Sequence, residues 1–422
     1  MLERYFIKPQ TIDRIRGSWI GEPIEKYVEW LTDNGYASRN IFRRVPILMH
    51  FGKFAQARGT KTWDELPDYV APFANAWTRA HGQDRKTERG RKGVFNEART
   101  PVQQMLRLVL PGYVGFGRSR TSQDPFLDYA PKFFEYLREE RGLRRSSILH
   151  YGHYLRLFEA YIKEINLKNL YALSPPVLSA FVLKSSHSLS RSSMIGLCCV
   201  MRVFLRYLHR QRLTSHDLSI TVESPQKYRQ SDIPRSISWD EVRKMLESID
   251  RRTTLGKRDY AILLLLVTYG LRAHEIAQLT LDDINWKEER LNVSDRKAGH
   301  STTYPLSSLV GEAILDYLRH GRTKTEDRHL FFRVLAPLKP LTHVAVSNRA
   351  SYYLHKAGIP VARPGSHTLR HTCVQRLVDA SFSLKIIGDY VGHRSPSSTE
   401  IYSKVDIEAL REVAMGDGED IL

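Results

Sequence analysis

Two arginines in the second half of the chain have the surroundings expected of phosphate ligands. Arg272 lies in the segment Thr-Tyr-Gly-Leu-Arg-Ala-His-Glu, and Arg370 lies in His-Thr-Leu-Arg-His. A guanidinium can donate two parallel hydrogen bonds to phosphate oxygens, whereas a lysine offers a point charge. We therefore predict that Arg272 and Arg370 bind one phosphate and neutralise the charge that develops on it during phosphodiester cleavage.

A tyrosine phenol, of which Tyr402 is one candidate, can be the nucleophile for such a cleavage. A free tyrosine has a pKa near 10, so only about one phenol in a thousand is ionised at pH 7, and neighbouring cations must favour the phenolate. Tyr352, Tyr353 and Tyr390 are alternatives in predicted helices. The residues alone leave these alternatives open. Tyr402 follows His393 by nine residues, in a helix predicted to begin at the Ser-Pro pair after that histidine.

Two further residues are predicted to act beside the arginines. His367 precedes Arg370 by three residues, so both lie on one face of a helix, whose start we predict at Gly365-Ser366. Glu275, one turn after Arg272, is predicted to orient its guanidinium. His367 and His371 have the spacing of a zinc pair, but no third ligand is suggested nearby, so we expect no metal.

The ordered set Arg272, Lys297, His367-x-x-Arg370, Gly-His393 and Tyr402 resembles the tyrosine recombinase (phage integrase) family, especially its Xer-like branch. The resemblance is strong over residues 238–414, looser over 124–218 and absent before them. It implies that Lys297 is the general acid that protonates the departing 5′ oxygen, although an exposed turn lysine is the alternative from the sequence alone. His274 departs from the small polar residue usual in the family, and we expect it to alter packing near Arg272.

The resemblance also implies a reaction and an assembly. Tyr402 would form a 3′-phosphotyrosine link without metal or nucleotide cofactor, and strands would be exchanged through a Holliday junction. The partners would be double-stranded DNA and other recombinase subunits, as a homotetramer or with related recombinases. A C-terminal helix over 406–414 would dock on a neighbouring subunit. A type IB topoisomerase and a catalytically silent DNA-binding regulator remain alternatives, and a mobile-element recombinase is our preferred biological role.

The pattern of elements predicts a mainly α fold with a small antiparallel β-sheet. We expect three parts: an N-terminal helical extension over 1–115, a helical core-binding domain over 122–218 and a catalytic domain over 235–418. A capping box at Ser238-Trp-Asp-Glu241 predicts the helix that opens the third part. Short runs at 283–286, 290–294 and 301–306 predict the strands, and the Pro-containing stretch 219–235 is predicted to be a linker.

The first part contains a basic stretch and a possible repeat. Residues 79–100 carry many Lys and Arg and three glycines, and we predict a solvated linker or a strap along the DNA backbone. The sequence predicts two amphipathic helical hairpins, one around Gly35 and one around Gly142. They are either a weak internal repeat or generic hairpins. We expect this extension to contact DNA beyond the core site.

Composition agrees with a DNA partner. The 422 residues include 64 Lys and Arg against 46 Asp and Glu, a net charge of +18, while 42% hydrophobic residues indicate a folded chain. Phosphate contacts by Lys and Arg release counterions, which suits this charge. Three cysteines without regular spacing indicate a reducing, intracellular protein, the family resemblance implies the bacterial cytoplasm, and the longest apolar run, 261–267, excludes membrane insertion.

Overall fold

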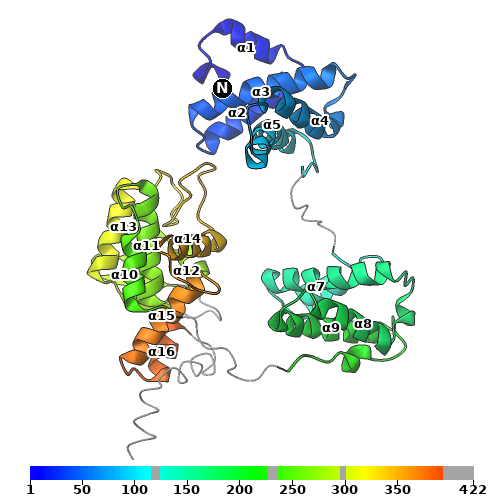
Figure 1. The fold of residues 1–422 in the computed structure, drawn as a ribbon, viewed down its shortest axis with the longest axis vertical. Helices are drawn as coiled ribbons and strands as arrows, with labels where there is room; N and C mark the ends of the chain where they lie inside the picture. Colours follow the sequence, from blue (N-terminus) through cyan, green and yellow to red (C-terminus); the bar gives the residue numbers. More distant parts are fainter. Residues whose placement is uncertain (116–123, 227–235, 295–300, 393–422) are drawn as a thin grey trace, which may run out of the picture. The chain divides into compact units, whose positions relative to one another are not determined.

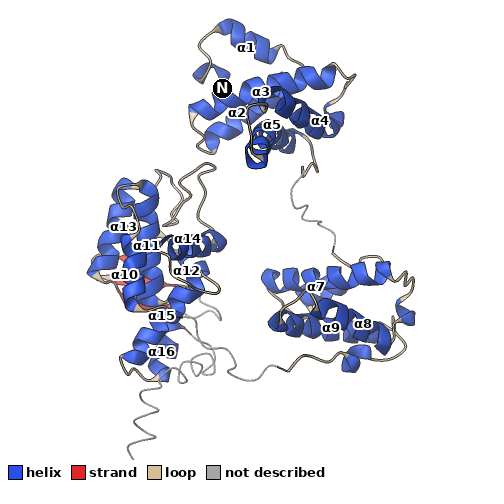
Figure 2. Cartoon of the chain, in the orientation of Figure 1, coloured by secondary structure: helices blue, strands red, loops and turns tan. Residues whose placement is uncertain are grey.

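The computed structural model describes residues 1–115, 124–226, 236–294 and 301–392, and it is mainly helical with one small sheet (Figure 1, Figure 2). This confirms the predicted fold class. The chain divides into two compact units, Phe116–Ser231 and the two flanking segments taken together. The buried apolar side chains form one core in residues 2–110, another in 126–222, a third in 237–369 and a small cluster in 374–391.

The N-terminal helices are α1 (Pro9–Arg16), α2 (Gly21–Asp33), α3 (Ser38–Gln56), α4 (Leu66–His81) and α5 (Glu88–Val109), with the short 3-10 turns η1 (Leu2–Arg4) and η2 (Trp63–Glu65). The linker predicted over 79–100 is wrong. That stretch contains the end of α4, a short loop and the first half of α5. Val94 and Ala98 are buried one turn apart, and the dense Lys and Arg around them conceal this helical period in the sequence.

The middle helices are α6 (Phe133–Glu139), α7 (Arg145–Glu164), α8 (Pro175–Ser186) and α9 (Arg191–Arg210), with 3-10 turns η3 (Leu170–Ala172) and η4 (Leu218–Thr221). The stretch predicted to be a linker from Ser219 onward begins as packed structure. Leu218 and Val222 are buried in the core of these helices, because η4 lies against α9. Residues 227–235 are outside the described residues.

The C-terminal part is built around α11 (Thr254–Tyr269), which is buried nearly all round. Its other helices are α10 (Trp239–Glu247), α12 (Ala273–Gln278), α13 (Ser308–His320), α14 (His343–Lys356), α15 (Ser366–Asp379) and α16 (Leu384–Val391). The predicted capping box is present, since Ser238 accepts a hydrogen bond from the Glu241 amide and the Glu241 carboxylate accepts one from the Ser238 amide. None of the described helices is long and apolar enough to cross a membrane.

The predicted sheet is also present. After the 3-10 turn η5 (Leu281–Asp283), strands β1 (Ile284–Asn285), β2 (Arg290–Val293) and β3 (Thr302–Pro305) pair antiparallel in the order β1-β2-β3. Leu291 lies opposite Tyr304, and both side chains are buried in the core of the C-terminal part. The turn between β2 and β3, which contains Lys297, lies outside the described residues.

A buried ion network fixes α11 to α14. Asp259 has no solvent exposure and accepts hydrogen bonds from Arg258 at 2.7 Å and from Arg349 at 2.6 Å. A buried carboxylate needs such partners, since an uncompensated charge in the interior is strongly unfavourable. The helix that leads to Arg272 is therefore held rigidly against the rest of the core.

Candidate active site

Arg272 is positioned by the turn between α11 and α12. The chain leaves α11 through Gly270, whose φ of +60° is in the left-handed region, where a Cβ atom is disfavoured. A Cβ there would also lie 3.1 Å from Val391 and 3.2 Å from Cys373. This close approach brings the end of α11 against α15 and α16, and Arg272 follows two residues later as the N-cap of α12.

The Arg272 guanidinium is held from two sides. Its Nη1 donates to Glu275 Oε1 at 2.7 Å, and its Nη2 donates to the Gly392 carbonyl at 2.8 Å. Glu275 also accepts a hydrogen bond from the Arg272 backbone amide at 2.8 Å. A guanidinium has five N–H donors, and the Arg272 side chain is 25% exposed. It can therefore reach a phosphate while its protein contacts stay in place.

Arg370 lies on α15 and is buried, with 5% exposure. Its Nη2 donates to the Val391 carbonyl at 2.7 Å, and its Nη1 donates to the Gly270 carbonyl. One side chain from α15 thus connects the ends of α11 and α16. The fork geometry of a guanidinium makes this double contact possible.

Both arginines contact consecutive carbonyls at the end of α16. Val391 accepts from Arg370, and Gly392, which ends the helix in a left-handed conformation, accepts from Arg272. The structure therefore brings Arg272, Glu275 and Arg370 together, as their spacing in the sequence led us to expect. The other predicted site residues, Lys297, His393 and Tyr402, lie outside the described residues.

His367 lies on the same helix as Arg370. It is in the first turn of α15, three residues before Arg370, and its side chain is exposed. The helix starts at Gly365-Ser366, as predicted: Gly365 is the N-cap, without a side-chain cap, and the Ser366 hydroxyl donates to Ser347 at 3.3 Å. The His367 and His371 rings are 6.5 Å apart, and within the described ranges no three metal-binding side chains come together.

The pKa of His367 predicts a particular pH dependence. Although the residue is exposed overall, partial desolvation of its ring, followed by the positive charges of Arg370 and Arg272, lowers its pKa from the ordinary value of 6.5. The ring is therefore mainly neutral at pH 7 and becomes protonated only as the pH falls through that lowered pKa. If the neutral ring accepts the proton of the nucleophile, single-turnover cleavage should be constant from pH 7 to 8 and decrease below pH 6.5.

The measurement is the rate of covalent complex formation as a function of pH, for the wild type and His367→Gln. We expect the variant to be slower at pH 7 and to lose the acidic decrease. If the cleavage rate of the variant still decreased at acidic pH, the decrease would be caused by the protonation of another group.

Glu275 is expected to act by positioning Arg272, because it contacts both the guanidinium and the backbone amide of that residue. Glu275→Gln keeps one carbonyl oxygen but removes the ion pair. A hydrogen bond to a charged group contributes about 1.5–3 kcal/mol, so single-turnover cleavage should decrease by about 10- to 100-fold with unchanged DNA affinity. The matched control is Glu241→Gln, which changes the capping carboxylate of α10 and should leave cleavage unchanged.

The carbonyl oxygens that hold the arginines were not among the residues expected from the sequence. Backbone acceptors have no side-chain signature, although Gly270 after Tyr269 and Gly392 before His393 are visible as breaks in helical sequence. The effect expected of His274 on packing near Arg272 stays a prediction. The His274 side chain is exposed, and its ring lies 6.1 Å from that of His343.

Comparison with known proteins places the chain in a family. The model of the phage integrase family matches residues 235–408, and that of the phage integrase N-terminal SAM-like domain matches residues 131–212. The putative integrase/recombinase y4rA of Sinorhizobium fredii (strain NBRC 101917 / NGR234) is 35% identical over 395 residues, which are 92% of this chain and 92% of the relative. Tyrosine recombinase XerC of Oceanobacillus iheyensis is 27% identical over 293 residues, 68% of this chain and 94% of XerC.

Solved structures share the fold. The XerH site-specific recombinase bound to its difH substrate matches with a TM-score of 0.53 and 17% identity, over 82% of this chain and 94% of XerH. A lambda integrase dimer bound to a COC′ core site matches with a TM-score of 0.53 and 16% identity, over 74% of this chain and 86% of the integrase.

The chain therefore belongs to the phage integrase family of tyrosine recombinases, which cleave and rejoin DNA. It is a site-specific DNA recombinase, as the order of its motifs predicted.

Proposed function

We propose that the chain recombines DNA through a 3′-phosphotyrosine intermediate in which Tyr402 is the nucleophile. The phenolic oxygen attacks the scissile phosphorus, the bond to the 5′ oxygen breaks, and that oxygen takes a proton from Lys297. The released 5′-hydroxyl then attacks the equivalent link on a partner strand. The energy of the broken bond is kept in the phosphotyrosine, so no nucleotide or metal cofactor is required.

One observation supports this proposal most directly. The guanidinium groups of Arg272 and Arg370 contact the carbonyls of Gly392 and Val391, which come immediately before His393 in the sequence and about ten residues before Tyr402. The phosphate ligands are thus attached to the segment that leads to the proposed nucleophile. Two fixed cations beside the reacting phosphate lower the barrier by favouring the transition state, in which negative charge increases.

The proposed assembly divides the work among the parts of the chain. We assign DNA core-site binding to residues 122–218 and catalysis to residues 235–418, and an N-terminal extension to residues 1–115. The active form is a tetramer on two DNA sites, or an assembly with related recombinases, with the helix over 406–414 docked on a neighbour. Bacterial relatives support action on DNA in the cytoplasm, and we propose a role in a mobile element.

The test is to trap the covalent intermediate. The wild-type protein is incubated without metal with a nicked suicide duplex that carries the candidate site from the flanks of the encoding gene. A covalent protein–DNA band on a denaturing gel, with the DNA attached through its 3′ phosphate to a peptide containing Tyr402, is the expected result. Bound DNA without covalent product on every candidate site would favour the silent DNA-binding alternative, and relaxation of plasmids without a paired site would favour the topoisomerase alternative.

A further inference from the structure

The N-terminal helices and the middle helices have the same order of elements. In each, a helix ends near a glycine with positive φ, Gly35 at +71° and Gly142 at +56°. A long helix follows, then a 3-10 turn, a shorter helix and a second long helix. The two sets of elements are related by one constant offset along the sequence. The same number of residues separates Gly35 from Gly142, the start of α3 from the start of α7, and the start of η2 from the start of η3.

The aromatic contacts of the two cores also correspond. Phe51 and Phe54 of α3 contact Phe73 of α4, with ring centroids 5.3 and 5.5 Å apart. In the middle helices, α7 and α8 make the same pair of contacts at 4.9 and 5.3 Å, through Phe158, Tyr161 and Phe181. Each aromatic residue of α3 and α4 is separated from its counterpart in α7 and α8 by the same offset as the surrounding elements, to within one residue. Generic helical hairpins would not repeat the same three-ring cluster at the same spacing.

The last helices, α5 and α9, also correspond, but the offset between them along the sequence is slightly shorter than the offset between α3 and α7. Thr87 caps α5 by accepting a hydrogen bond from the amide three residues later, and Ser190 caps α9 in the same way. In register with these caps, four buried apolar side chains of α5 each have a buried counterpart in α9: Val94, Ala98, Val102 and Met105 correspond to Leu197, Met201, Leu205 and Leu208. The two offsets differ because α4 and α8, with the loops beside them, differ in length.

We propose that residues 21–109 are a second copy of the four-helix fold of residues 133–210, and that this copy binds the DNA backbone through a basic recess where α4 meets α5. This proposal rests on the proposed role of the middle helices in DNA binding. It extends that role to a separate set of residues.

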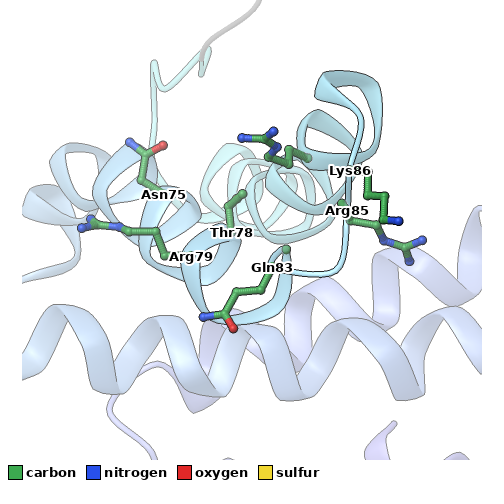
Figure 3. A pocket seen from close by; sticks show the side chains of 8 residues that line it. Asn75, Thr78, Arg79, Gln83, Arg85 and Lys86 are labelled. Carbon is green, nitrogen blue, oxygen red and sulfur yellow. The ribbon is translucent and has the colours of Figure 1, made fainter.

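The recess has a volume of about 690 Å³ and is lined by Asn75, Thr78, Arg79, Gly82, Gln83, Arg85, Lys86 and Arg91. Figure 3 shows Asn75 and Arg79 on one side, Arg85 and Lys86 on the other, and Thr78 and Gln83 between them. Four cations and three polar side chains around one hollow match the oxygens of a phosphodiester.

These cations are not used for folding in the described structure. The side chains of Arg79, Arg85, Lys86 and Arg91 are exposed, and none of them has an ion pair within the described residues, although Asp84 and Glu88 are close in sequence. Arg85 and Lys86 precede α5 and Arg91 lies near its start, where positive charge is unfavourable because the N-terminal end of a helix is itself positive; Arg79 is instead in the last turn of α4. Their clustering is better explained by an anionic partner.

The corresponding junction of the middle helices is different. The loop from α8 to α9 is His-Ser-Leu-Ser, and Lys184 at the end of α8 forms an ion pair with Glu164, its Nζ donating at 2.6 Å. The middle copy has one exposed cation without an ion pair in the described residues at this place, Arg191 at the start of α9, where the N-terminal copy has four. The N-terminal copy therefore adds phosphate contacts instead of repeating those of the middle helices.

The experiment uses the full-length chain and a long DNA duplex of arbitrary sequence, because phosphate contacts do not depend on sequence. In one variant Arg79, Arg85, Lys86 and Arg91 are changed to Gln. In a matched control Lys8, Arg39, Lys53 and Lys61, exposed residues of the N-terminal part outside α4 and α5, are changed to Gln. The affinity is measured over a series of salt concentrations.

The slope of log K against log salt decreases by about 0.9 for each phosphate that the protein no longer neutralises. We expect the recess variant to have a slope smaller by about 2 to 3.6 than the wild type, and the control to match the wild type. Equal slopes in the two variants would overturn the proposal. The suicide-substrate reaction at low salt tests the recombinase chemistry separately from DNA binding by the recess. The recess variant should still form the covalent product, and only failure of the wild type would count against recombinase chemistry.

Discussion

Tyr402→Phe is expected to abolish covalent protein–DNA product while leaving DNA binding unchanged. The substitution removes only the phenolic oxygen, which is the atom that would join to phosphorus. Because this oxygen is the proposed nucleophile, we expect the loss to be complete instead of partial. The measurement is the fraction of suicide substrate in the covalent band, beside the midpoint of DNA binding for the same preparation.

Two other tyrosines provide controls for this result. The Tyr390 hydroxyl donates to the Thr268 carbonyl at 3.0 Å, and burial raises its pKa well above the ordinary value, so its phenolate is strongly disfavoured. Tyr352 is exposed but lies on α14, where its ring contacts Arg349. Tyr390→Phe and Tyr352→Phe should both retain the covalent band. Its disappearance in either variant, with Tyr402→Phe active, would assign the nucleophile elsewhere.

Arg370→Lys is expected to reduce single-turnover cleavage by at least about 100-fold, which corresponds to about 3–4 kcal/mol of transition-state stabilisation. The positive charge is retained, so simple neutralisation of the phosphate would predict a small effect. A lysine cannot donate at once to the carbonyls of Gly270 and Val391, as Arg370 does, and it cannot present a fork to two oxygens. The measurement is the rate of covalent product formation at saturating protein.

Arg376→Lys is the matched control for this substitution. Arg376 lies on the same helix, is exposed, and has its guanidinium carbon 4.1 Å from the centre of the Trp239 ring. We expect its rate to stay within a few-fold of the wild type. A thermal melt of both variants distinguishes loss of folding from loss of catalysis, and a normal rate in Arg370→Lys would contradict a role for the fork geometry.

The parts of the fold that were predictable from sequence are those with a local side-chain signature. Ser238 and Glu241 form a reciprocal cap that involves only four consecutive residues, and the short strands alternate with turn residues. The start of α5 was not predictable because its buried face is reduced to a few small residues, such as Ala98, among many cations. There the tertiary contacts with α4 decide the structure.

The candidate site divides in the same way. Arg272, Glu275 and Arg370 were predictable because their charge and spacing are visible in the sequence. The carbonyls of Gly270, Val391 and Gly392 were not, since every residue has a carbonyl and only the folded chain shows which ones converge. The position of Glu275 against the Arg272 backbone amide also depends on the turn after Gly270.

The contacts of the two arginines with Val391 and Gly392 have a thermodynamic consequence. A displacement of the last turn of α16 breaks a hydrogen bond to Arg370 and a hydrogen bond to Arg272 together, and each such bond to a charged group contributes about 1.5–3 kcal/mol. Phosphate affinity and the conformation of this turn are therefore reciprocally linked. Whatever pulls on the chain after Gly392 changes the affinity for the scissile phosphate, and an occupied phosphate site in turn resists that pull.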